Sequence, residues 1–376
     1  MPIVTRRRPN VTSEPRVLAV GAAAGGVADT FPGTASALRE RGYSVSAIAL
    51  EERGSALAGA WRAAWRVRAS LLSHDSLLME FGSNDLTVFW LAVVVMTFRK
   101  DVVLIIHDPP KVAHAPGAAI VARRGTWRMR LAYRVLSPML DTVLVGFVLG
   151  RAGAVVVLSE QARTELQART RRPVLAAPHG LATWDTQGSP PSECRYVLFA
   201  GFLGPSKGVD VLIDAWSSLE DRSFQLLIAG GAGEAHTAWA ADLQSFSERF
   251  SNPPNWLGSV PEEEAFNLLF ANAALVVLPY RASSPASGIL VRAMAAGRCI
   301  IASRVPACVE AIRDGEDGVL VDVGDPASLA SAMQKLLADP KERNRLGRAA
   351  ADRAASIFGW DKYGEVVDSA VRCVAR

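Results

Sequence analysis

The stretch that decides the fold is Ala274–Ser303, "ALVVLPYRASSPASGILVRAMAAGRCIIAS". An apolar run is followed by a polar turn, a helical run that closes at Gly297, and a second apolar run. This order predicts a strand, a turn, a helix and another strand. The first N–H groups of such a helix, with the positive end of its dipole, suit an anion. An ordinary strand-to-helix connection has the same pattern, so the rest of the chain must decide.

The same alternation runs through both halves of the chain. The first half contains the strand-like and helical runs "RVLAVG", "TASALRERG", "YSVSAIAL", "DVVLIIHD" and "GAVVVLSE". The pattern restarts at Arg195 with "RYVLFAGFL", "GVDVLIDAWSSL" and "FQLLIAGG", after a polar stretch, "DTQGSPPSE", that reads as a linker. We therefore expect an α/β protein with two open parallel sheets, each covered by helices. Such sheets bind ligands outside the carboxyl ends of their strands, so we expect function in a cleft between the two halves.

Composition excludes several classes of protein. The 376 residues are 50% hydrophobic and 21% charged, which favours two buried cores, and the net charge of +4 is too small to indicate nucleic-acid binding by itself. The four cysteines show no CxxC spacing, so we expect reduced, cytosolic thiols and neither a zinc site nor a disulfide framework. The longest apolar run, Thr87–Phe98, is shorter than the roughly 20 residues of a membrane span. We expect no transmembrane helix and no signal peptide.

Five segments between Arg195 and Asp339 resemble the retaining GT-B glycosyltransferases of family 4, also called glycosyl transferases group 1. They are "VLFAGFLGPSKGVDVLIDAW", "LLIAGG", "NWLGSVPEEEAFNLLFANAALVVLPY", "AMAAGRCIIAS" and "IRDGEDGVLVDVGDPASLASAM", in the order of the family. The N-terminal half is similar more loosely, through Gly25 and Gly26, the "HD" of His107 and Asp108, and "APHGL".

The resemblance implies the GT-B fold, with two Rossmann-like domains facing a cleft. We expect a basic tail (1–15), an acceptor domain (16–185), a linker (186–195), a nucleotide-sugar-binding domain (196–355) and a C-terminal helix that crosses back to the first domain (356–376). The resemblance also implies transfer of a sugar from a nucleotide-diphosphate sugar, with retention of configuration, no metal and no cofactor.

The donor site implied by the resemblance is only partly retained. Lys207 in "GPSKG" matches a lysine that faces the donor diphosphate, but Phe202 stands where the family has an arginine. Both of the family's paired glutamates are replaced, by Arg292 and Ser284. The backbone N–H groups of Ser287, Gly288 and Ile289 remain available to a diphosphate.

Some of these residues have two interpretations. Arg292 either adds positive charge to the phosphate site or is a surface residue, exposed or paired with Glu310. Gly25 and Gly26 form either a phosphate-facing loop or a tight turn. Lys207 is either a phosphate ligand or a solvated loop residue, and we favour the former.

His107 ends an apolar strand, where a polar side chain would face the cleft. The resemblance places His107 near the acceptor and the donor sugar, and we assign it to positioning or sugar recognition. Lys207 and the backbone N–H groups would stabilise the leaving diphosphate, which could itself take the acceptor proton. His179 in "PHGL" resembles a hinge motif. The remaining histidines show no metal-ligand spacing.

Residues 111–134 concentrate positive charge without any acidic residue. Such a segment with interleaved aromatics is typical of a helix that lies on anionic lipid, although a solvated helix face has the same pattern, and no motif favours nucleic acid. The lipid interpretation implies a polyprenyl-linked or other lipid acceptor at the inner face of the plasma membrane. The residues assigned to this surface are Arg123, Arg124, Trp127, Arg128 and Arg130.

Two functions remain from the sequence. The first is a cytoplasmic glycosyltransferase that acts in cell-surface polysaccharide or glycolipid synthesis on a glycan or lipid-linked acceptor. The alternative is a non-catalytic GT-B partner subunit that binds a glycan or another transferase. They differ in whether a nucleotide diphosphate binds.

Overall fold

A computed structural model describes most of the chain, in two compact units. Unit 1 comprises residues 1–177 and 363–376, and unit 2 comprises residues 178–362. The described residues are 14–23, 26–51, 56–82, 85–107, 139, 142–180, 193–220, 223–233, 236–282 and 287–375.

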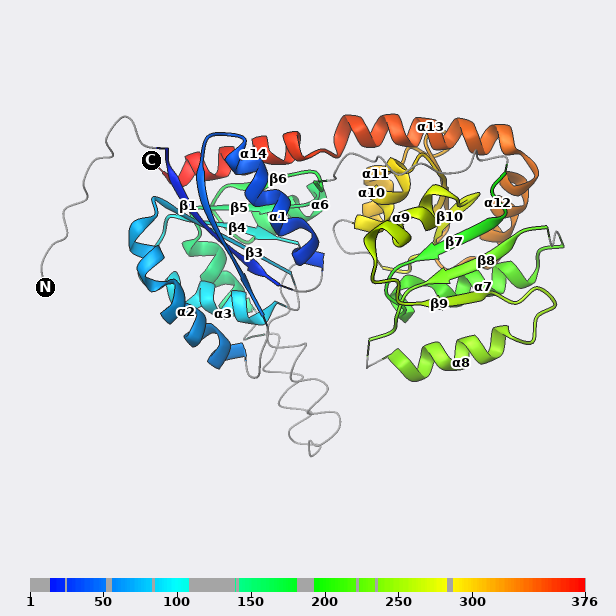
Figure 1. The fold of residues 1–376 in the computed structure, drawn as a ribbon, viewed down its shortest axis with the longest axis horizontal. Coiled ribbons are helices and arrows are strands. Elements are labelled where there is room, and N and C mark those ends of the chain that lie inside the picture. Colours follow the sequence, from blue (N-terminus) through cyan, green and yellow to red (C-terminus); the bar gives the residue numbers. More distant parts are fainter. Residues whose placement is uncertain are drawn as a thin grey trace, which may run out of the picture. The chain divides into compact units, whose positions relative to one another are not determined.

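Unit 1 is built on six parallel strands in the order β2-β1-β3-β4-β5-β6 (Figure 1). Their bounds are β1 Arg16–Ala22, β2 Ser44–Leu50, β3 Ser76–Phe81, β4 Val102–Ile106, β5 Ala154–Val157 and β6 Val174–Ala176. The helices include α1 Gly26–Arg39, α2 Ala56–Ser73, α3 Leu86–Val95, α6 Glu160–Gln167 and α14 Trp360–Val374, which is in unit 1 from Tyr363 onward. The central strands β3, β4 and β5 are buried along their whole length, which explains why they read as apolar runs.

Unit 2 repeats this architecture with the strand order β12-β11-β10-β7-β8-β9, again all parallel. The strands are β7 Tyr196–Ala200, β8 Gln225–Ala229, β9 Asn255–Gly258, β10 Leu275–Leu278, β11 Cys299–Ser303 and β12 Val319–Val321. The helices are η1 Pro205–Lys207, α7 Val209–Ser217, α8 Thr237–Ser247, α9 Glu263–Ala271, α10 Gly288–Ala295, α11 Pro306–Ala311, α12 Pro326–Ala338 and α13 Pro340–Ile357. The stretch Ala274–Ser303 therefore forms β10, α10 and β11, with β10 and β11 parallel neighbours, as predicted.

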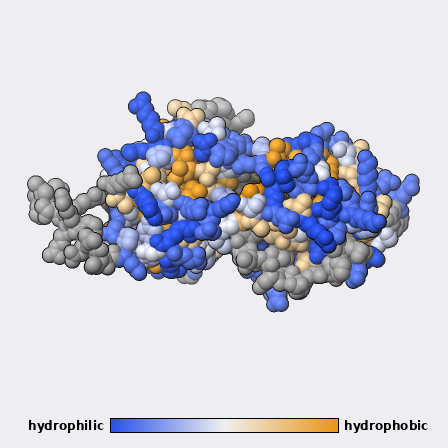
Figure 2. All heavy atoms as spheres, turned by 90° about the horizontal axis from the view of Figure 1, so that it is seen from above, coloured by the Kyte–Doolittle hydropathy of each residue, from blue (hydrophilic) through white to orange (hydrophobic). Residues whose placement is uncertain are grey.

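The apolar run Thr87–Phe98 falls largely in α3, which buries seven of its ten residues. A helix of this length belongs to a core. Among the described helices, none combines the length and the apolar character needed to cross a membrane. On the face shown in Figure 2, hydrophilic residues cover most of the surface, as expected when the apolar residues fill the two cores.

Residues 178–180 group with unit 2, because they pack on its elements. A Cβ at Gly180 would lie 2.3 Å from the ring of Trp360, and one at Gly288 would lie 3.6 Å from Nε2 of His179. Part of the predicted linker, residues 186–192, lies outside the described residues, as do residues 1–13 of the predicted tail.

Candidate functional site

The carboxyl ends of β3 and β4 bring a histidine and a glutamate together in unit 1. Glu80 is the penultimate residue of β3, and His107 directly follows β4. The parallel register pairs Phe81 with Ile106, and the backbone N–H of His107 donates to the carbonyl of Phe81 at 3.1 Å. His107 is thereby held at the sheet edge where we expected it.

Glu80 was not anticipated as a site residue, although among the described residues it makes the shortest hydrogen-bond contact of His107. Its Oε1 lies 2.8 Å from Nε2 of His107 and accepts a hydrogen bond from the hydroxyl of Thr30 at 2.8 Å. Glu80 is fully buried, and the His107 side chain is 11% exposed. Hydrogen bonds offset part of the cost of burying a carboxylate, and here both Nε2 of His107 and the hydroxyl of Thr30 lie within hydrogen-bond distance of Oε1.

The polar cluster continues into α14. The hydroxyls of Thr34 and Tyr363 lie 2.8 Å apart, and the Thr34 hydroxyl also lies 3.3 Å from the carbonyl of Thr30, to which it donates. Burial, and then the negative charge of Glu80, hold the pKa of Tyr363 well above its ordinary value. Tyr363 is therefore a neutral phenol, and α14 contributes a hydrogen-bonding group to the interior of unit 1.

In unit 2, Lys207 lies on the loop after β7, at the end of η1. The next residue, Gly208, has φ +66°, and a Cβ there would lie 1.9 Å from the carbonyl oxygen of Pro279. Only glycine permits both this conformation and this approach. The loop that carries Lys207 therefore packs closely against Pro279, which directly follows β10.

Tyr280 connects two of the predicted site residues. The ammonium of Lys207 lies 4.2 Å from the centroid of the Tyr280 ring, and the Tyr280 hydroxyl lies 3.3 Å from Oγ of Ser287. Burial raises the pKa of Tyr280, so the phenol stays neutral. The structure thus brings Lys207 and Ser287 around one aromatic ring, with a cation–π contact to the lysine.

Ser287 is the N-cap of α10, and its hydroxyl oxygen accepts from the backbone N–H of Leu290 at 3.3 Å. Gly288 and Ile289 form the first turn, whose N–H groups lack intrahelical acceptors by geometry. Ile289 lies beside Gly201, at the end of β7. Ser287, Gly288 and Ile289 therefore lie at the same sheet edge as the Lys207 loop.

Two histidines that we had not assigned to the site lie at this edge. Nδ1 of His179 donates to the carbonyl of Gly180 at 2.9 Å, which leaves Nε2 on the side of Gly288. The ring of His236, before α8, lies beside Gly204 in the Lys207 loop, where a Cβ would be 3.1 Å from Cδ2. The sequence related His179 to a hinge motif and gave His236 no role, because the place of each beside the Lys207 loop or α10 depends on how the loops of unit 2 fold back.

Arg292 faces α9 of unit 2. Its guanidinium donates to Oδ1 of Asn267, lies 3.5 Å from Oε1 of Glu263, and stacks 5.5 Å from the centroid of Phe266. The ion pair is thus with Glu263, whereas we had considered Glu310. Glu263 of α9 therefore neutralises part of the positive charge of Arg292.

Several predicted residues lie outside the described part of the chain, and their assignments stay predictions. Gly26 is described as the first residue of α1, and the preceding strand β1 ends at Ala22. The residues not described are Gly25, Asp108, Arg123, Arg124, Trp127, Arg128, Arg130 and Ser284.

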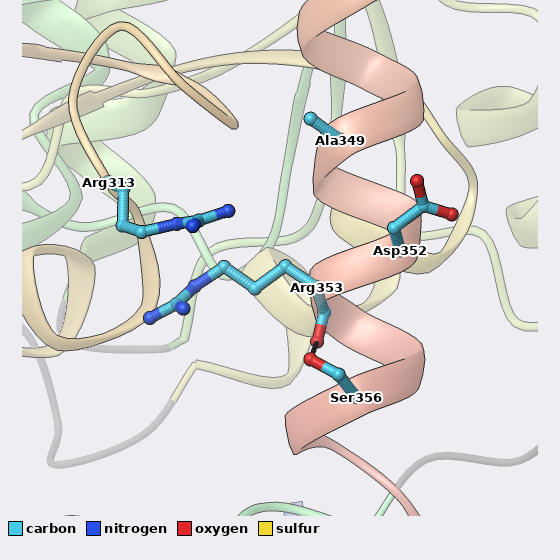
Figure 3. Close-up of a pocket in the computed structure, with 5 residues that line it drawn as sticks. All are labelled: Arg313, Ala349, Asp352, Arg353 and Ser356. Carbon is cyan, nitrogen blue, oxygen red and sulfur yellow. Dashed lines mark hydrogen bonds between the residues drawn. The ribbon is translucent and has the colours of Figure 1, made fainter.

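A pocket of about 300 Å³ in unit 2 lies along α13, as Figure 3 shows. None of the predicted site residues lines it. Arg313 and Arg353 enter it, and both pair with Asp317, whose Oδ2 lies 2.6 Å and 3.7 Å from their respective Nε atoms. We do not assign this pocket to the site, because its cations are already paired. Within the described ranges, no cluster of three or more His, Cys, Asp or Glu side chains could hold a metal ion.

The two sheets and their helices define a two-domain α/β fold of the GT-B type. Sucrose-phosphate synthase from Thermosynechococcus elongatus superposes with a TM-score of 0.76 at 18% identity, over 95% of this chain and 98% of that one. Anabaena Alr3699/HepE in complex with UDP and glucose gives a TM-score of 0.73 at 16% identity, over 95% and 99%. These similarities show the fold.

The similarity in sequence is concentrated in unit 2. Residues 194–339 match the family described as Glycosyl transferases group 1. A D-inositol 3-phosphate glycosyltransferase of Corynebacterium diphtheriae is 30% identical over 188 residues, which are 48% of this chain and 42% of that protein. The match thus spans less than half of the length of this relative.

Proposed function

We propose that the protein is a glycosyltransferase that moves a sugar from a nucleotide-diphosphate sugar to a glycan or lipid-linked acceptor. The arrangement of Lys207 and Ser287 around Tyr280 carries this proposal, because it joins a cation to the start of a helix at one sheet edge. Both features suit a diphosphate. The arrangement lies within residues 194–339, the segment similar to glycosyl transferases group 1.

We infer a transfer with retention and without a metal or other cofactor. Lys207 and the N–H groups of Gly288 and Ile289 would stabilise the leaving diphosphate electrostatically. The acceptor proton would pass to the departing phosphate, so His107 is left to recognise a sugar. The replacement of both paired glutamates, by Arg292 and Ser284, implies a donor sugar or ribose contact that differs from the one in the family.

For the acceptor we propose a lipid-linked substrate at an anionic membrane surface, with the protein on the cytoplasmic side and a role in cell-surface polysaccharide or glycolipid synthesis. Helix α2 of unit 1 supports this independently of residues 111–134. It has no acidic residue and exposes Trp61, Trp65 and Leu72 at spacings of four and seven, which place them on one face. The guanidinium of Arg68 lies 3.6 Å from the Trp65 ring centroid. The cations of this helix are Arg62, Arg66 and Arg68.

Binding to vesicles tests the membrane proposal. Tryptophan and arginine on one helix face suit the interface of an anionic bilayer, where each cation contributes about 1 kcal/mol. Trp61→Ser with Trp65→Ser should weaken cosedimentation with vesicles of anionic phospholipid, and so should high salt. The control is Phe246→Ser, which removes an exposed aromatic side chain of α8 and should leave vesicle binding unchanged. Trp216 is unsuitable as a control because it is buried in unit 2, where its replacement would disturb the core. Equal binding by all variants would contradict the proposal.

The alternative is a non-catalytic partner subunit. One observation favours it: Arg292, at the position where the family has a glutamate, forms an ion pair with Glu263. Thermal-shift screening with UDP, GDP and ADP separates the two functions. Stabilisation by one nucleotide, followed by turnover of the matching nucleotide sugar, is the expected result. No shift with any nucleotide would favour the subunit.

A further inference from the structure

The pair Glu80–His107 joins a buried carboxyl oxygen to a ring nitrogen 2.8 Å away. We propose that Glu80 is a positioning residue that fixes the tautomer of His107, with the ring proton on Nε2 and the lone pair of Nδ1 presented to a sugar hydroxyl. The identity of the ligand as a sugar rests on the proposed function, whereas the tautomer of His107 does not depend on that function.

The proton count at Glu80 determines the tautomer. A carboxylate only accepts hydrogen bonds. Its Oε1 lies 2.8 Å from Nε2 of His107 and 2.8 Å from the hydroxyl of Thr30. Since a carboxylate has no hydrogen to donate, the hydrogen between Oε1 and the ring must belong to Nε2. Thr30 Oγ1 lies only 3.2 Å from the same nitrogen and can share this hydrogen as an acceptor.

Nδ1 is then the nitrogen left for a ligand. Of the described residues, none hydrogen-bonds to Nδ1, and the side chain retains an 11% exposed surface at the carboxyl end of β4. In a neutral ring with hydrogen on Nε2, Nδ1 is an acceptor. Hydroxyl groups are the donors that a sugar offers in abundance.

The cost of burying Glu80 supports a role beyond packing. The rest of β3 is apolar from Leu77 to Met79, and Phe81 follows. Oε2 of Glu80 is buried without a hydrogen-bond partner in the described part of the chain. An apolar residue would avoid this cost. A carboxylate is explained if its charge orients the ring of His107.

The ring ¹⁵N shifts of histidine-labelled protein, followed from about pH 6 to 9, test the tautomer directly, because protonated and unprotonated ring nitrogens resonate far apart. We expect His107 as the Nε2–H form when neutral. Two other histidines are internal controls of the opposite form. Nδ1 of His74 lies 2.7 Å from the carbonyl of Ser70, and Nδ1 of His179 lies 2.9 Å from that of Gly180, so both should be Nδ1–H. An Nδ1–H signal for His107 would overturn the proposal.

Glu80→Gln tests the cause. With its NH₂ toward Nε2, glutamine leaves one carbonyl unpaired, whereas the opposite orientation buries two N–H groups without acceptors. Buried orphan N–H groups are the rarer case, so we expect the proton of His107 to move to Nδ1 while His74 and His179 stay unchanged. Glu80→Leu, which keeps the packing, should leave His107 a mixture of tautomers. An unchanged His107 spectrum in both variants would overturn the role of Glu80; if a variant does not fold, the wild-type spectrum still decides the tautomer.

Turnover provides the second measurement. Glu80→Gln should lower kcat/KM by about 10- to 100-fold, as expected when a hydrogen bond to substrate is replaced by an unpaired polar group. The affinity for UDP should stay within twofold, since Lys207 is unchanged. Full activity with the switched tautomer would refute the contact between Nδ1 and substrate. Inactivity of the wild type with every nucleotide sugar would count against the proposed function, while the spectrum would still test the tautomer.

Discussion

Gly208→Ala tests how closely the Lys207 loop approaches the turn before α10. A Cβ at this position would lie 1.9 Å from the carbonyl oxygen of Pro279, although real Cβ contacts are essentially never under 3.0 Å, so the loop or the turn must move by roughly 1 Å. The residue also has φ +66°. We expect about 1–2 kcal/mol for alanine in the left-handed region and a further 1–3 kcal/mol for the displacement.

The predicted loss in the free energy of unfolding is therefore about 2–5 kcal/mol, or roughly 4–20 °C in Tm for a domain of this size. Gly324→Ala is the matched control, because Gly324 has φ +74° but a Cβ there would meet nothing within 4 Å. It should lose only about 1–2 kcal/mol. Chemical denaturation measures both, and calorimetric titration with UDP shows whether the displacement of Lys207 lowers affinity. Equal denaturation midpoints and equal UDP affinities for the two variants would refute the close approach.

Three further predictions concern charge. Lys207→Ala should weaken UDP binding by about 10- to 150-fold, because a hydrogen bond to a charged group contributes about 1.5–3 kcal/mol, and Lys207→Arg should recover much of it; unchanged calorimetric affinity would exclude Lys207 from the site. Arg292→Gln should lower the free energy of unfolding by about 1 kcal/mol through loss of its contacts with Glu263 and α9, with UDP affinity kept within twofold; a large fall in affinity would instead assign Arg292 to the phosphates. Burial, and then a hydrogen bond to Asp368, raise the pKa of Tyr43 to about 12, so its stabilising effect is complete below about pH 10, the ordinary phenol value, and is lost as the pH rises through 12. Tyr43→Phe should flatten denaturation midpoints over that window, and an unchanged slope would contradict the shift.

The fold was largely predictable because parallel strands buried on both faces read as short apolar runs between helices. The strand β3 was missed for a physical reason. Glu80 interrupts the run "SLLMEF", and a charged residue argues against a buried strand unless its partner is known. That partner, His107, is 27 residues away in sequence and becomes a neighbour only because β3 and β4 pair.

Some residues of the candidate site could be proposed from the sequence, whereas others become recognisable only in the folded structure. Ser287 and Gly288 could be proposed from the local pattern of a helix start, and Lys207 from the resemblance of "GPSKG" to the family. Tyr280 could not be recognised as the ring between them, because its contact with Lys207 spans 73 positions. The partner of Arg292 depends on α9 packing beside α10, which a search within one helix cannot reveal.

The position of helix α14 determines which of the two units can complete its fold first during synthesis. Unit 1 begins at the N-terminal strand β1, yet its interior includes Tyr363, and the space beside Gly153 is filled by Val374, whose Cγ1 would lie 2.1 Å from a Cβ there. All of unit 2 is translated in between, which takes roughly 10–40 s at about 5–20 residues per second. During that interval the first 177 residues lack the helix that covers part of their core, while unit 2 can complete its own. Unit 2 is thus expected to mature first on the ribosome, and the nascent unit 1 is the part of the chain that chaperones would be expected to shield.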